Sequence, residues 1–182
     1  MAAIIVIALR LVVPLTILRW PLAGGLASML LDAVDVILVD AIASVLGEPG
    51  EFGPFYAQID KWLDLWYLSL ELVIVRGWTE PLVRRAATGL FIWRLIGVIL
   101  FEITGSRPLL VVFPNLFENF FIYVLVVRRW FPRFMPSTVP QLIVVLAALL
   151  VPKLGQEYVL HWEELHPWQW LRDQVIAPVL GR

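Results

Sequence analysis

The stretch YAQIDKWLDLWYLSLELVIVR, residues 56–76, decides how the rest of the chain is interpreted. It is long enough to cross a bilayer, since a transmembrane helix needs about 20 mostly apolar residues. Yet it carries Asp60, Lys61, Asp64 and Glu71. An ionisable side chain near the bilayer centre costs at least about 2.5–3.5 kcal/mol on insertion scales, so such groups face the bundle interior or water. The stretch therefore predicts a membrane helix with one polar side.

The composition of the whole chain is typical of a membrane protein. Of 182 residues, 60% are hydrophobic and 16% are charged, whereas soluble domains have about 45–50% apolar and about 25% charged residues. A net charge of −1 provides no basic field for binding nucleic acid. The absence of cysteine excludes disulfides and argues against iron–sulfur clusters. The two histidines, His161 and His166, lie near the C-terminal end, which argues against haem or chlorophyll ligation in the bilayer.

Further apolar segments, bounded by glycine, proline or charged residues, predict further membrane helices. Together with residues 56–76, the expected spans are about 2–18, 22–46, 84–104, 108–127 and 138–160. We therefore expect an all-α, polytopic transmembrane bundle of about six spans, with a single domain over residues 1–162. The tryptophans of residues 163–182 predict an amphipathic tail at the membrane interface.

Basic residues mark the loops expected on the cytoplasmic side, because lysine and arginine are enriched there. Seven basic residues lie in or beside loops 19–21, 77–83 and 128–137, and three lie in the opposite loops and the tail. These three loops are therefore predicted to be cytoplasmic and both termini to lie outside. The expected partner is the lipid bilayer, with other membrane subunits or a second copy of the chain as further candidates.

Helical periodicity gathers the polar residues of three spans onto one side of each helix. At about 100° per residue, the polar residues of span 56–76 share an arc of about 80°, those of span 22–46 about 60° and those of span 108–127 about 100°. The residues concerned are Tyr56, Asp60, Asp64, Tyr67 and Glu71, then Ser28, Asp32 and Asp35, and finally Asn115, Glu118 and Asn119.

These polar sides predict an interior with more acids than bases. Away from the span ends, the bases within the spans are Arg10, Lys61, Arg94 and Lys153. Surplus buried carboxylates need protons, cations or a cationic ligand. We therefore predict an acidic chamber that binds or translocates a cation, a proton, or a polar or lipid-linked solute. The expected binding residues are Asp32, Asp35, Asp60, Asp64, Tyr67, Glu71, Arg94, Asn115, Glu118 and Asn119.

The same charges allow a structural role as an alternative. Pairs such as Asp32 or Asp64 with Arg94, or Glu118 with Arg10, would hold helices together. Polar contacts between membrane helices contribute about 0.6 kcal/mol on average. In this alternative the chain is an accessory structural subunit of a membrane complex.

Two prolines interrupt expected spans. Pro114 lies within residues 108–127 and Pro152 within residues 138–160. Each either kinks its helix, as prolines in membrane helices do, or breaks it and exposes backbone carbonyls to a ligand, as in discontinuous transporter helices.

Two neighbouring motifs resemble the signature of the CDP-alcohol phosphotransferases, DxxDGxxAR followed by GxxxDxxxD on the next helix. Here they read DAVD, which begins at Asp32, and YAQIDKWLD, which ends at Asp64. The resemblance implies a metal-dependent lipid head-group transferase in which Asp32, Asp35 and Asp60 bind Mg²⁺ or Mn²⁺ and Asp64 is the catalytic base.

The chain departs from that signature at the positions that meet the nucleotide. Val36 and Tyr56 replace the two glycines, and Val39-Asp40 replaces Ala-Arg. The transferase is therefore an alternative to the cation-binding chamber, and the sequence leaves open whether the chain is an enzyme.

A second resemblance extends over most of the chain. The segments LDAVDVILVD, YAQIDKWLDLWYLSLE, RLIGVILFEITGSRPLLVVFPNLFENFFIYV and PKLGQEYVLHW are similar to those of an uncharacterised family of bacterial integral membrane proteins. This resemblance implies a multi-pass protein of the bacterial cytoplasmic (inner) membrane and assigns no activity.

Overall fold

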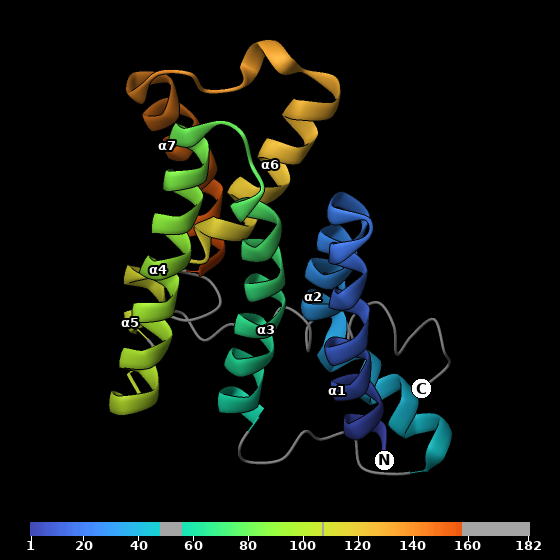
Figure 1. The fold of residues 1–182 in the computed structure, drawn as a ribbon. Coiled ribbons are helices and arrows are strands. Elements are labelled where there is room, and N and C mark those ends of the chain that lie inside the picture. The colour runs from blue at the N-terminus through green and yellow to red at the C-terminus, as the bar shows by residue number, and fades with distance from the viewer. Residues whose placement is uncertain (48–55, 107, 158–182) are drawn as a thin grey trace.

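The structure is built of helices (Figure 1). This computed structural model describes residues 1–47, 56–106 and 108–157, and within these residues it contains no strand. The expected interfacial tail and the end of the last expected span, residues 158–182, lie outside the described part. The elements are α1 (Ala2–Val12), η1 (Val13–Leu18), α2 (Pro21–Leu46), α3 (Tyr56–Arg76), α4 (Pro81–Thr104), α5 (Pro108–Val112), α6 (Leu116–Trp130), η2 (Pro132–Phe134) and α7 (Val139–Glu157).

Proline and glycine set the ends of the two longest helices. Pro21 and Pro81 occupy the first positions of α2 and α4, where a missing N–H removes no helical hydrogen bond. Gly47 and Gly105 follow the same helices with φ of 69° and 67°, the left-handed conformation that glycine adopts without steric penalty. The ends predicted for these helices at residues 46 and 104 are confirmed.

The two prolines within expected spans act differently. At Pro114 the apolar segment 108–127 breaks into α5 and α6. Pro152 lies inside α7, which continues past it to Glu157. The alternative of a broken helix is thus found at Pro114, and there it frees backbone groups beside the polar interior.

Helix α3 is the central helix of the bundle. It contacts α1, η1, α2, α4 and α6. Figure 1 shows α1 and α2 as an antiparallel pair on one side of α3, with α4 and α5 on the other side. The polar row predicted on this helix is therefore enclosed: Asp64 is 4% exposed, Tyr67 3% and Glu71 0%.

Close packing brings η1 onto α2, and an aromatic core joins α3, α4 and α6. A Cβ at Gly24 would collide with backbone atoms of Thr16 and Ile17, so only glycine allows this approach. On the other side of α3, Phe117 and Phe121 are fully buried. The ring of Phe121 stacks on Trp78 with a centroid distance of 5.9 Å, an offset geometry that favours aromatic pairs.

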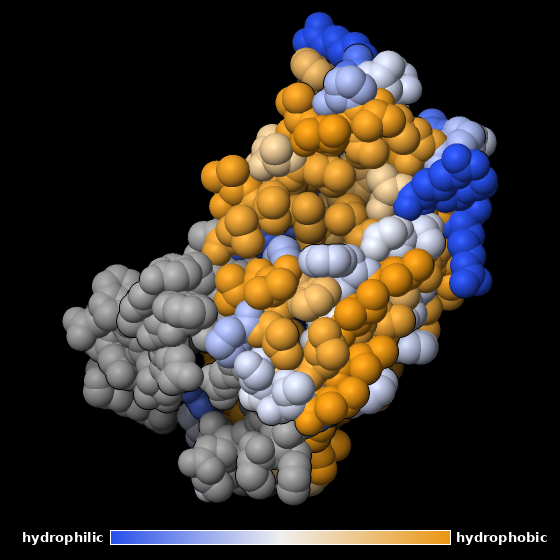
Figure 2. All heavy atoms as spheres, turned by 90° about the vertical axis from the view of Figure 1, so that its left-hand side faces the viewer, coloured by the Kyte–Doolittle hydropathy of each residue, from blue (hydrophilic) through white to orange (hydrophobic). Residues whose placement is uncertain are grey.

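The outer face over α4 and α5 is apolar. Ile92, Ile96, Ile99 and Ile103 of α4 are all exposed, and Figure 2 shows a broad hydrophobic surface there with charged groups at one end. By length and composition, two described helical segments could cross a membrane, Pro81–Thr104 and Pro108–Trp130, the latter comprising α5 and α6. An all-helical protein is confirmed; the count of six spans stays a prediction.

The loops predicted to be cytoplasmic lie toward one end of the bundle (Figure 1). Loops 77–83 and 128–137 are joined by an ion pair in which Nη2 of Arg128 donates to Glu80 at 2.6 Å. The guanidinium of Arg128 also lies over the Trp78 ring, 5.1 Å from its centroid. Partial burial raises the pKa of Glu80, but its backbone hydrogen bond and Arg128 outweigh this, so the pKa lies below its ordinary value.

Candidate functional site

Arg10 of α1 lies at the centre of four aspartates. Its residue is 3% exposed. Nη1 donates to Asp35 and, at 2.7 Å, to Asp60. Nη2 donates to Asp32 and, at 3.0 Å, to Asp64. One guanidinium therefore holds carboxylates from two other helices, and we name these five residues the aspartate cluster.

Helical spacing explains why these carboxylates converge. Asp32 and Asp35 are three residues apart on α2, and Asp60 and Asp64 are four apart on α3, so each pair lies on one side of its helix. Both helices contact α1. The planar guanidinium offers several donors, a geometry suited to binding more than one carboxylate.

Two more bases reach the aspartate cluster. Lys61 donates to Asp60 at 2.7 Å and to Asp64 at 3.4 Å. Nη2 of Arg94 lies 3.6 Å from Asp64. The side chain of Asp64 is only 6% exposed, whereas that of Asp60 is 18% and that of Asp32 32% exposed. The cluster is therefore open on the side of Asp32 and closed toward Asp64.

Three aspartates of this cluster have the spacing of a metal site. One oxygen each from Asp32, Asp60 and Asp64 lie within 4.8 Å of one another; Asp35, a metal ligand by the resemblance to the CDP-alcohol phosphotransferases, is not among these three. Arg10 donates to all three of these residues. A guanidinium thus supplies the positive charge that Mg²⁺ or Mn²⁺ would supply, so this arrangement does not fit a resident divalent ion.

A second polar group lies where α5 ends and α6 begins. Asn115 precedes α6, and its Nδ2 donates to Glu118 at 2.8 Å and to the Tyr67 hydroxyl at 3.4 Å. Glu118 lies in the first turn of α6, where the helix dipole favours negative charge. Nη1 of Arg94 donates to the Phe113 carbonyl at 3.0 Å. Arg94 therefore connects this group to the aspartate cluster.

Glu71 is the most deeply buried carboxyl group of the interior described by the structure. It is 0% exposed, and neither of its oxygens has a hydrogen-bond partner among the described residues. A Cβ built at Gly25 would lie 3.2 Å from Oε1 of Glu71, 3.0 Å from Ile122 and 3.2 Å from Phe121. Oε1 of Glu118 and Oδ1 of Asn115 are also buried without a partner.

The structure brings together most residues that the sequence singled out. Asp32, Asp35, Asp60 and Asp64 share Arg10, and Tyr67, Asn115 and Glu118 share hydrogen bonds. The other residues behave differently. Arg94 links these two groups. Glu71 has no hydrogen-bond partner among the described residues, and Asn119 is half-buried and joins neither group. The side chain of Tyr56 lies outside the described part.

Sequence reasoning missed the part played by Arg10 and Lys61. The pair of Glu118 with Arg10, suggested under the structural alternative, is not found in the described part of the chain, where Arg10 holds four aspartates. Of the suggested pairs, Asp64 with Arg94 is present at 3.6 Å. A base in the middle of the first apolar segment was the available signal for Arg10. Glu102, which lies within the expected span 84–104, is exposed on α4.

No protein-family model, no curated protein and no solved structure matches the chain. The two resemblances seen in the sequence therefore stay predictions. The function has to be argued from the geometry of the interior.

Proposed function

We propose that the chain is a multi-pass protein of the bacterial cytoplasmic membrane that binds and translocates a small cation. In this proposal the bundle crosses the membrane about six times, as its apolar segments suggest. The loops 19–21, 77–83 and 128–137 lie in the cytoplasm, in accord with their basic residues.

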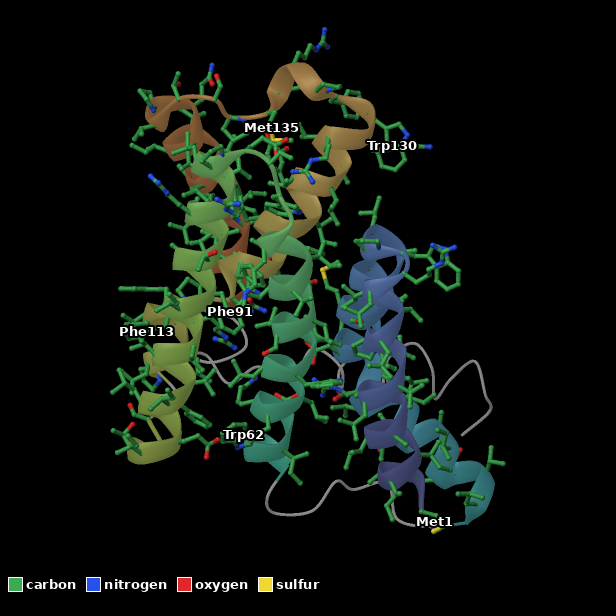
Figure 3. All side chains as sticks on the ribbon, in the orientation of Figure 1. Met1, Trp62, Phe91, Phe113, Trp130 and Met135 are labelled. Carbon is green, nitrogen blue, oxygen red and sulfur yellow. The ribbon has the colours of Figure 1, made fainter. Side chains whose placement is uncertain are left out.

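The surface supports a membrane location. The exposed isoleucines of α4 form the kind of apolar face that soluble monomers avoid. Trp62 and Trp130 are 61% and 56% exposed, and Figure 3 shows them toward opposite ends of the bundle. Tryptophans at both ends of a membrane protein anchor it at the two interfaces.

The observation that carries the proposed activity is a row of carboxylates along one face of α3. The side chain of Asp60 is 18% exposed and that of Asp64 6%, and Glu71, about two turns further along, is 0% exposed. Tyr67 lies between them on the same helix face. Such a row leads from a partly open cluster into the protein interior, as ionisable groups on ion pathways do.

The balance of charge agrees with this activity. Counting only the described interior, six carboxylates face four bases. A buried charge without a partner is strongly unfavourable, so the surplus is neutralised by protons or by a mobile cation. The carboxylates are Asp32, Asp35, Asp60, Asp64, Glu71 and Glu118, and the bases are Arg10, Lys61, Arg94 and Lys153.

Flux through reconstituted protein tests the proposal. Purified protein in liposomes is given a membrane potential, and uptake is followed with dyes for H⁺, Na⁺ and K⁺. We expect flux of one ion in the wild type, and loss of that flux in Asp64→Asn. The matched control is Glu102→Gln, which changes an exposed carboxylate on α4 and should conduct normally. Wild-type rates equal to those of protein-free liposomes for all three ions would refute the proposal.

A structural subunit is the second candidate, and the Arg10 contacts favour it. One buried guanidinium that binds four carboxylates ties α1, α2 and α3 together. If this is the whole purpose of the charges, the wild type shows no flux, and Arg10→Gln disrupts the fold or an assembly with other membrane subunits. The transferase alternative has less support, because Arg10 already holds the proposed metal ligands.

A further inference from the structure

We propose that Glu71 is a proton-binding site, held as an uncharged carboxylic acid at the inner end of the carboxylate row. This inference rests on the proposed function, because it names the cation that the interior binds. It also adds a site separate from the aspartate cluster, because Glu71 is neutralised by a proton and not by basic side chains.

The absence of any donor at Glu71 is the first step. Both oxygens are buried and have no hydrogen-bond partner in the part of the chain that the structure describes. Burial of an ionised carboxylate without a partner is far less favourable than burial of the neutral acid. Buried carboxyl groups in such places accordingly bind a proton.

The groups around Glu71 cannot replace that proton with a fixed charge. Helix α2 presents Gly25, and α6 presents the side chains of Phe121 and Ile122. Glu118 of α6 lies in the same buried interior, and a second carboxyl group there disfavours negative charge on Glu71 instead of balancing it. On α3 itself the nearby titratable group is Tyr67.

The same surroundings decide between a proton and a metal ion. Hard metal cations bind several oxygen ligands at once. Beside Oε1 of Glu71, at Gly25, lie the side chains of Phe121 and Ile122, which offer no oxygen ligand. A proton needs only one oxygen, because it forms a covalent O–H bond with the carboxyl group.

Gly25 makes room for this carboxyl group. A Cβ there would meet Oε1 of Glu71 at 3.2 Å, which is tighter than ordinary contact. The missing side chain allows the carboxyl group to lie directly against α2. Glu71 of α3 therefore lies where α2 and α6 meet it at Gly25, Phe121 and Ile122.

Infrared spectroscopy of the full-length protein in nanodiscs tests this assignment. A protonated buried carboxyl group has a C=O stretching band, which is absent from an ionised carboxylate. We expect this band at neutral pH in the wild type and in Glu102→Gln, and its loss in Glu71→Gln. Glu71→Asp should shift the band, which keeps the test available if the glutamine variant does not fold. Gly25→Ala should shift it too.

Three results would overturn the assignment. The wild-type minus Glu71→Gln spectrum could show only carboxylate bands, which means that Glu71 is ionised. The signal could depend on Na⁺ instead of pH, which means that the site binds a metal ion. The wild-type band could persist unchanged in both Glu71 variants. The liposome flux is a separate readout: flux without the band refutes the proton site alone, whereas the band without flux refutes translocation alone.

Discussion

The aspartate cluster and the surroundings of Glu71 are two acidic regions on the same side of α3, yet they are built in opposite ways. In the cluster, each carboxylate has a basic partner and part of the group is open to solvent. Glu71 is 0% exposed, and it has no hydrogen-bond partner within residues 1–47, 56–106 and 108–157. Fixed positive charge makes the first region a rigid joint between helices. Its absence makes the second region dependent on a proton.

The largest effect on stability is expected when Arg10, the centre of the aspartate cluster, is replaced. Arg10→Gln leaves several buried carboxylates without their shared partner. Removal of one member of a buried ion pair costs about 3–5 kcal/mol, so we expect a loss of this size in the free energy of unfolding, measured by denaturant titration in detergent. The control is Arg19→Gln, which replaces an exposed arginine directly after η1. Equal stability of the two variants would contradict the role of Arg10 in holding α1, α2 and α3 together.

The two neighbouring glycines of α2 differ in what surrounds them. At Gly24 a new methyl group collides with the backbone of η1, whereas at Gly25 it meets the ends of side chains. Gly24→Ala should therefore destabilise the protein by about 1–3 kcal/mol, the usual cost of overpacking. Gly25→Ala should destabilise the protein less than Gly24→Ala does, when both variants are compared by thermal unfolding. The reverse order would show that η1 does not rest on α2 in this way.

Replacement of Glu71 by leucine should stabilise the protein, whereas the substitutions above destabilise it. An apolar side chain removes a buried polar group that has no partner, a penalty of about 1 kcal/mol or more. We expect Glu71→Leu to raise the free energy of unfolding by about 1 kcal/mol and to abolish proton flux in liposomes. A clear loss of stability would indicate that Glu71 has a partner that stabilises its charge.

The smallest effect is expected for the half-buried surface pair of Glu80 and Arg128. The pKa of Glu80 lies below its ordinary value of 4.5, so the pair stabilises the folded protein above that pH and the contribution disappears as the pH falls through the lowered pKa. Exposed pairs contribute about 0.2–1 kcal/mol. Unfolding followed from pH 7 to pH 3 should show a slightly smaller acid-dependent loss in Glu80→Gln than in the wild type. Identical pH profiles would rule out this contribution.

Much of the fold could be predicted because it depends on local rules. Apolar length, proline at helix starts and glycine at helix ends give α2 and α4 to within a few residues. The period of about 3.6 residues assigns Asp64, Tyr67 and Glu71 to one side of α3. That side is buried.

The partners within the interior could not be predicted in the same way. Periodicity gives the face of a helix but not its rotation against its neighbours, so it could not show that Arg10 meets four aspartates rather than Glu118. Lys61 lies off the row of Asp60 and Asp64, but its long, flexible side chain reaches back to both. The exposure of Glu102 follows from its place in the last turn of α4, close to the helix end, where a carboxylate can reach a polar environment.

The break at Pro114 has a mechanical consequence. Arg94 holds the Phe113 carbonyl at the break and also lies beside Asp64. Loss of the charge of Asp64 weakens its attraction for the guanidinium of Arg94. This changes the contact that Arg94 makes with the Phe113 carbonyl, between α5 and α6. We therefore expect the angle between α5 and α6 to depend on the charge of Asp64. Spin labels on exposed positions of α5 and α6, compared between the wild type and Asp64→Asn, measure that movement directly.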